Sequence, residues 1–160
     1  MKEPEIIEIP SKRLIGFSLE MSLSDNQTYA LWSQFMPRRK EIVGVVNANL
    51  YSVQVYDSTF LKGLFTPQTI FEKWAAVEVA VSCPVPEGME ALTISTGRYA
   101  IFIHQGSASN FPQTAQYIYG TWLPQSGYQL ADQPHFEVMG EKYLGADHPD
   151  SEEEVWVPLI

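Results

Sequence analysis

Residues 94–102 read Ile-Ser-Thr-Gly-Arg-Tyr-Ala-Ile-Phe, and residues 9–17 read Ile-Pro-Ser-Lys-Arg-Leu-Ile-Gly-Phe. Isoleucine, arginine and phenylalanine recur at the same places, 85 residues apart (94 − 9). Further along, residues 122–124 (Trp-Leu-Pro) echo residues 35–37 (Phe-Met-Pro) at an offset of 87 (124 − 37). Internal similarity of this kind indicates a duplicated module. We expect one domain over residues 1–160, with repeat halves at about 1–83 and 89–160.

Each half has the pattern of a strand, a helix and two further strands. Alternating apolar residues predict the strands, and a capping residue before an apolar stretch of helical spacing predicts each helix. The predicted strands cover residues 5–9, 13–21, 50–56, 74–81, 94–102, 134–140 and 152–160, and the predicted helices follow Ser24 and Asn110. We therefore expect an α+β fold, a duplicated strand–helix–strand–strand module with pseudo-twofold symmetry. Antiparallel sheets would carry the helices on one side and leave a ligand cleft between the halves.

The last predicted strand, residues 152–160, carries an unusual combination of side chains. A strand has a period of two, so Glu154, Trp156 and Pro158 share one face, while valines occupy the other. If the first face lines a cavity, a carboxylate beside an indole suits a flat, apolar ligand with positive charge. The alternative is that residues 152–154 form a solvated acidic run and that Trp156 only packs.

The bulk composition excludes several functions. The chain has 160 residues with 45% hydrophobic and 18% charged residues, which is typical of one globular domain. Its net charge of −9 argues against direct binding of nucleic acid, which requires basic surfaces. It has neither an apolar signal region at the N-terminus nor an apolar stretch long enough to span a membrane. We expect a cytoplasmic protein without membrane contact.

Metal and cofactor sites are not expected. Cys83 is the only cysteine, and His104, His135 and His148 are scattered without the spacing of metal ligands. Ser107 lies outside a Gly-x-Ser-x-Gly motif, and no serine–histidine–aspartate arrangement can be recognised. The sequence therefore predicts no catalytic residues, no metal and no cofactor.

Three segments of the second half carry a family resemblance. They are residues 117–132 (Tyr-Ile-Tyr-Gly-Thr-Trp-Leu-Pro-Gln-Ser-Gly-Tyr-Gln-Leu-Ala-Asp), 134–138 (Pro-His-Phe-Glu-Val) and 150–159 (Asp-Ser-Glu-Glu-Glu-Val-Trp-Val-Pro-Leu). The chain resembles the GyrI-like small-molecule-binding family, the effector-binding domain of AraC-type and MerR-type regulators, which also occurs alone. The resemblance implies a cleft glutamate on the final strand followed two residues later by an aromatic residue, here Glu154 and Trp156. The family often has tyrosine at the second position, so tryptophan widens the stacking surface but removes the phenol.

Further pocket candidates come from strands that should face the cleft. Tyr51, Trp74 and Phe136 are each either ligand wall or core. Glu78 and Glu137 lie within apolar strands and are either on a solvent face or further pocket carboxylates. Tyr117 and Tyr119 either reach the cleft from the second helix or pack against the sheet.

Three functions compete at this stage. The leading one is non-catalytic binding of amphipathic, cationic small molecules, as in multidrug binding, by a stand-alone effector-binding domain. A separate transcriptional regulator acting in trans would be its further partner. The second is hydrolysis of reactive small molecules with the cleft glutamate as general base, because an apolar cleft raises a carboxyl pKa toward neutrality. The third is a protein-interaction role such as inhibition of DNA gyrase.

Overall fold

The computed structural model describes all 160 residues as eight strands and several short helices. The strands are β1 (Glu5–Ile9), β2 (Lys12–Met21), β3 (Leu50–Val55), β4 (Phe71–Val79), β5 (Glu90–Ile94), β6 (Gly97–Gln105), β7 (His135–Met139) and β8 (Glu152–Leu159). The α-helices are α1 (Thr28–Phe35), α2 (Ser58–Leu61), α3 (Phe111–Gln116) and α4 (Leu123–Ser126). Short 3₁₀ and π segments are η1 (Met36–Glu41), η2 (Ala108–Asn110) and η3 (Tyr117–Trp122). The prediction of an α+β fold with a duplicated module is confirmed, and each half carries one further strand, β1 or β5, ahead of the predicted strand–helix–strand–strand order.

All eight strands form one antiparallel sheet in the order β1-β6-β8-β7-β3-β4-β2-β5. The two halves pair at three places: β1 with β6, β2 with β5 and, in the middle of the sheet, β3 with β7, from Leu50 opposite Met139 to Gln54 opposite His135. The sheets that we predicted for the separate halves are therefore joined, because this pairing satisfies backbone groups that two free edges would leave open. None of the helices combines the length and hydrophobicity that crossing a bilayer requires.

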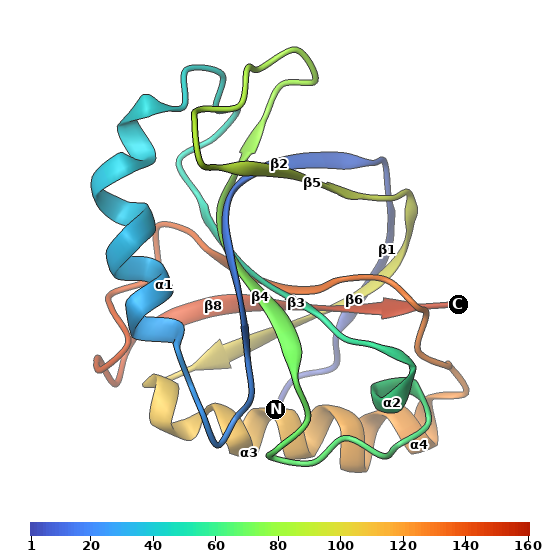
Figure 1. Cartoon of the computed structure of the whole chain (residues 1–160). Helices are drawn as coiled ribbons and strands as arrows, with labels where there is room; N and C mark the ends of the chain where they lie inside the picture. Colours follow the sequence, from blue (N-terminus) through green and yellow to red (C-terminus); the bar gives the residue numbers. More distant parts are fainter.

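The sheet curls strongly because of two short connections. Residues 10–11 join β1 to β2, although these strands lie at opposite ends of the sheet order. Residues 95–96 join β5 to β6 in the same way. A two-residue link spans only about 7–10 Å, so the ends of the sheet must approach each other. Figure 1 shows the result almost end-on, with β2 and β5 above, β1 at the right, and β6 and β8 below.

The helices cover the outside of this curl and define its outer face. Leu31 and Phe35 of α1 pack with Ile15 and Phe17 of β2 in one buried cluster. Ile118 and Trp122 of η3 pack in a second cluster, with alanine, phenylalanine and valines of β6 and β8. Figure 1 shows α1 beside the sheet and α3–α4 beneath it, both outside the ring of strands. A third cluster lies on the opposite side of the sheet, which we call the inner face.

The first helix begins later than predicted. Residues 22–25 close a turn in which the Asp25 amide donates to Ser22 Oγ, so Ser24 does not cap a helix. The helix starts at Thr28, whose amide donates to the Asn26 side chain. On the other half, α3 directly follows Asn110 as predicted, although the Asn110 side chain makes no capping hydrogen bond, and Pro112 lies in the first turn of the helix.

The strand registers show how the halves correspond. Arg13 and Arg98 lie at equivalent positions, and they pair with Val79 and Leu159, respectively. The offset is therefore 85 between β2 and β6 (98 − 13) but 80 between β4 and β8 (159 − 79). The pairing of β3 with β4 and of β7 with β8 is consistent with this: Tyr51 pairs with Ala76 and Phe136 with Trp156, so β3 and β7 are offset by 85 (136 − 51) and β4 and β8 by 80 (156 − 76). Consequently Trp74 is the counterpart of Glu154, Ala76 of Trp156 and Glu78 of Pro158.

A strip of polar side chains lies on the outer face between the two helical layers. The Gln54 amide donates to the Glu137 carboxyl at 3.1 Å across the joint between the halves. Tyr119 and His135 share a hydrogen bond of 2.9 Å nearby. Burial raises the pKa of Glu137 to about 7 and lowers the pKa of His135 to about 3. Glu137 is thus buried on the helix side, and neither of its two predicted placements is correct.

Substitution of Gly16 by alanine should be strongly destabilising. Its Cβ would lie 1.9 Å from the Ala75 carbonyl oxygen of the neighbouring strand, which cannot move aside without disturbing the sheet. We expect a loss of about 3 kcal/mol or more in the free energy of unfolding, measured by urea denaturation. Gly97→Ala is the control, because its Cβ would meet only the Gln133 side chain at 3.5 Å. Similar losses for both variants would contradict the assignment of close strand contact to Gly16.

Substitution of Glu137 by glutamine should make the protein more stable at alkaline pH. Because burial raises the pKa of Glu137 in the folded state, its contribution is fully present at low pH. It is lost as the pH rises from the unfolded-state pKa toward about 7, where the native carboxyl ionises. We expect the free energy of unfolding of Glu137→Gln to exceed that of the wild type by about 2–3 kcal/mol at pH 8 and to differ little from it at pH 4.5. Urea titrations at both pH values test this, and a difference independent of pH would contradict it.

Candidate functional site

The inner face collects the side chains that point away from the helices. Residues paired directly across antiparallel strands lie on the same face. One row across the sheet runs through Trp156, Phe136, Val53, Trp74 and Ser18. The next row runs through Glu154, Val138, Tyr51, Ala76 and Gly16. All five residues predicted to bind ligand, Glu154, Trp156, Trp74, Tyr51 and Phe136, therefore lie on the inner face.

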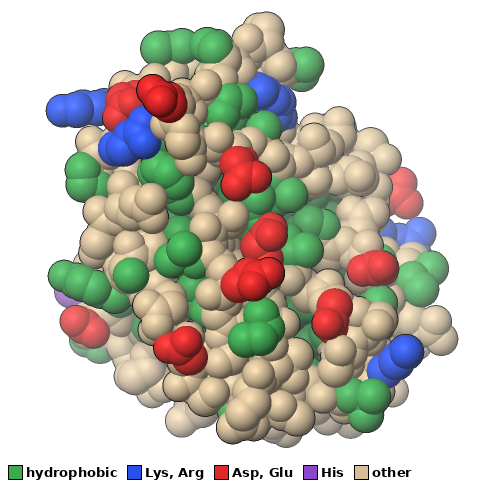
Figure 2. All heavy atoms as spheres, viewed as in Figure 1, with side chains coloured by type: hydrophobic (Ala, Val, Ile, Leu, Met, Phe, Trp, Pro, Cys, Tyr) green, Lys and Arg blue, Asp and Glu red, His purple; other side chains and the backbone are tan.

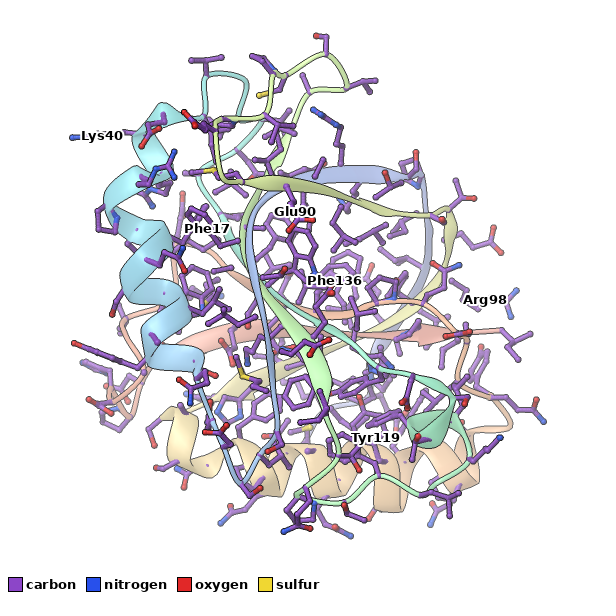
Figure 3. The ribbon with its side chains drawn as sticks, viewed as in Figure 1. Phe17, Lys40, Glu90, Arg98, Tyr119 and Phe136 are labelled. Atoms are coloured by element: carbon purple, nitrogen blue, oxygen red, sulfur yellow. The ribbon has the colours of Figure 1, made fainter.

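Aromatic rings form the centre of this face. Phe136 is completely buried and stacks on Trp156, with ring centroids 5.1 Å apart and an interplanar angle of 20°. Tyr99 and Tyr51 contact Phe136 at centroid distances of 5.3 Å and 6.0 Å. Figure 3 shows Phe136 near the middle of the ring of strands. The rings fill the centre of the predicted cleft, so a ligand has to enter from the side where Trp156 is only half-buried.

Two glutamates on this face bind the indole of a tryptophan two residues further along the same strand. The Trp156 indole N–H donates to Glu154 at 3.1 Å, and the Trp74 indole N–H donates to Glu72. Both carboxylates are half-buried, and neither takes part in a salt bridge. Each pair thus places an uncompensated negative charge beside a wide aromatic surface. Along the sheet the two tryptophans are three strands apart, or roughly 14 Å.

A second polar group on the inner face is centred on Glu78. Its carboxylate accepts a hydrogen bond from the Tyr51 hydroxyl at 2.8 Å and lies 3.4 Å from the Lys12 ammonium. Burial, together with the neighbouring Glu78 carboxylate, raises the pKa of Tyr51, so this phenol remains a hydrogen-bond donor. The Lys12 ammonium also lies over the ring of Trp156, 6.0 Å from its centroid. Glu78 therefore lies on the inner face, on the same side of the sheet as the predicted pocket residues and not on a solvent face.

The inner face and its rim are acidic. Cross-strand pairing places Glu20 with Glu72, Glu90 with Gly16, and Glu5 with Ile101 on the inner-face side. Figure 2 shows acidic side chains gathered at the centre of the molecular face that looks into the curl, whereas basic side chains lie toward its periphery. Figure 3 places Glu90 within the same ring of strands as Phe136. Such an arrangement attracts cations and disfavours anions.

Other predicted candidates lie elsewhere. Tyr119 bonds His135 and Tyr117 packs on Phe102, so both tyrosines face the outer side of the sheet. His104 is buried there as well, bound to Thr114. No group of three or more histidine, cysteine or acidic side chains is arranged to hold a metal ion. Two shallow hollows of about 370 and 310 Å³, lined around Arg98 and around Gln113, are separate from the aromatic centre.

Sequence reasoning missed Glu72 and Lys12. The repeated spacing Glu-x-Trp in residues 72–74 and 154–156 is a signal that could have identified Glu72. Lys12 had no such signal, because its contact with Trp156 depends on how far the sheet curls. In the sheet order, strands β7, β3 and β4 lie between β2, which carries Lys12, and β8, which carries Trp156.

Comparisons with known proteins agree with this architecture. The GyrI-like small molecule binding domain model matches residues 2–160. The transcriptional regulator BrlR of Pseudomonas aeruginosa is 28% identical over 156 residues, which are 96% of this chain and 54% of that protein. The chain thus spans about half the length of this relative.

Two solved structures share the fold at low sequence identity. SAV2435 bound to tetraphenylphosphonium aligns with a TM-score of 0.72 and 14% identity, covering 99% of this chain and 94% of that one. A hydrolase encoded by lin2189 from Listeria innocua aligns with a TM-score of 0.58 and 10% identity, covering 99% and 92%. The match to the family model over nearly all residues shows that the chain belongs to the GyrI-like small molecule binding domain family.

Proposed function

We propose that this domain binds amphipathic, aromatic cations on its inner face and does not transform them. The observation that carries the proposal is the pair of half-buried carboxylates, Glu154 and Glu72, each bound only to the indole beside it. A carboxylate in a partly apolar site favours a counter-cation more strongly than one in water does. The flat rings alongside add stacking and cation–π attraction. Glu154 and Trp156 are the main ligand-binding residues in this proposal, with Trp74, Tyr51 and Phe136 forming the wall behind them.

The relatives support this ligand class and suggest its biological use. SAV2435 was solved with tetraphenylphosphonium, a lipophilic aromatic cation, and shares the fold. BrlR is a transcriptional regulator about twice as long as the matched segment. We propose that ligand binding here is read out by a DNA-binding part, located in the same polypeptide or in a separate regulator acting in trans.

Hydrolysis is the less favoured alternative. A general base of this kind usually works with a second proton-transferring or orienting group. His104 and His135 are buried on the outer face, and His148 lies in a loop. Glu154 would therefore have to act without a histidine, and its bonded neighbour is the indole N–H of Trp156.

Glu154→Gln should weaken binding of tetraphenylphosphonium about 10-fold, because it removes one partly desolvated charge without changing side-chain size. Binding of triphenylphosphine oxide, a neutral aryl compound, should change less than about 2-fold, since stacking on Trp156 is retained. Isothermal titration or quenching of tryptophan fluorescence measures both affinities. Chromatography of the recovered ligands checks that neither compound is transformed.

Glu87→Gln provides the matched control. Glu87 is exposed in the loop near Arg38, so its substitution removes the same net charge away from the inner face. The control should lose less than about 2-fold in affinity for the cation. Equal losses for Glu154→Gln and Glu87→Gln would show that only the overall charge matters. If Glu154→Gln lost affinity equally for the cationic and the neutral compound, the proposed ionic contact would be contradicted.

A further inference from the structure

The aromatic surface proposed for the ligand cation is already in contact with a cation of the chain itself. Phe136 stacks on the Trp156 ring at 5.1 Å, and the Lys12 ammonium lies over the same ring at 6.0 Å. The indole N–H is bonded to Glu154. A ligand cation that approaches this indole therefore meets a like charge, which opposes its binding.

Lys12 is held in this position from both sides. Its ammonium lies 3.4 Å from Glu78, and the two side chains are only 20% and 18% exposed. Glu78 in turn accepts from Tyr51 and from the Asn47 side chain. The lysine thus has an ionic partner from its own half of the molecule and an aromatic partner from the other half. It joins the two halves across the inside of the curl.

The duplicated half lacks this arrangement. The counterpart of Lys12 at the offset of 85 is Gly97, and the counterpart of Glu78 at the offset of 80 is Pro158. A purely structural pair that supported each half would be expected in both. The ion pair is instead confined to the first half and points toward the tryptophan of the second.

We propose that Lys12 is an internal counter-ion that occupies part of the cation site in the free protein and sets its affinity. This inference rests on the proposed function. A bound cation displaces the Lys12 ammonium from Trp156 into water and leaves Glu78 free to face the ligand. The displacement is sterically feasible because lysine has four flexible methylenes and follows the short link between β1 and β2. A ligand binds only if its interactions with the site outweigh the free energy of the Lys12–Glu78 contact that it breaks. Cations that interact weakly with the site are therefore excluded.

The test is a titration of tetraphenylphosphonium into the full chain carrying Lys12→Met, which keeps an unbranched side chain one atom shorter and removes its charge. We expect the affinity to rise about 10-fold, because repulsion is removed and Glu78 is uncompensated. Lys62→Met, an exposed lysine beyond α2, is the control and should rise less than about 2-fold. In a Glu78→Gln background the gain from Lys12→Met should fall below about 3-fold, since the released carboxylate is absent.

Acetylation of lysines, followed by mass spectrometry, provides a readout that needs no variant. Saturating tetraphenylphosphonium should accelerate modification of Lys12 and leave Lys62 unchanged. If the wild type binds the cation but Lys12→Met binds it equally or more weakly, or if Lys12 is not released, the internal counter-ion is disproved while the proposed function stands. If neither the wild type nor Lys12→Met binds the cation, the proposed function itself fails.

Discussion

The curl imposed by two short links is the constraint on which the rest of this structure depends. Residues 10–11 and 95–96 each join strands from opposite ends of the sheet order, so the sheet must close toward itself. Closure gives the sheet an inside and an outside with different chemistry. The helices bury the outside with apolar side chains, whereas the buried cluster on the inside consists of strand residues only. Aromatic rings and carboxylates of the strands themselves occupy the inside, which is why we propose the ligand site there.

The two halves share their backbone arrangement but differ in side-chain size at equivalent positions on the inner face. Gly16 and Ala76 occupy positions whose counterparts are Ile101 and Trp156. Small residues in the first half allow β2 and β4 to approach closely, since a Cβ added at Gly16 would collide with the Ala75 carbonyl oxygen. Large residues in the second half supply the aromatic surface. The repeated halves thus share their strand order, whereas their inner-face side chains differ at the positions where we propose the ligand site.

Much of the fold could be predicted from the sequence, because the repeat at an offset of 85 and the alternation of apolar residues are local signals. The face of β8 that carries Glu154 and Trp156 also followed from a period of two. The closure of one sheet through β3 and β7 did not follow, because strand pairing between halves leaves no local pattern. The burial of Glu137 on the outer face could not be predicted either. The alternation of residues along its strand fits a face exposed to solvent as well as a face covered by helices.

The contrast between Glu137 and Glu154 explains why we propose the less buried of the two carboxylates as the one that binds the ligand. Glu137 is the more deeply buried, and burial raises its pKa to about 7, so near neutrality it is partly protonated and bonded to Gln54. A neutral carboxyl beneath a helical layer offers a cation little attraction. Glu154 is half-buried, keeps access to solvent, and has an indole on one side. A carboxylate that keeps access to solvent, is only partly desolvated and lies beside an indole suits the cation site that we propose, and on these strands that combination occurs at Glu154 and not at Glu137.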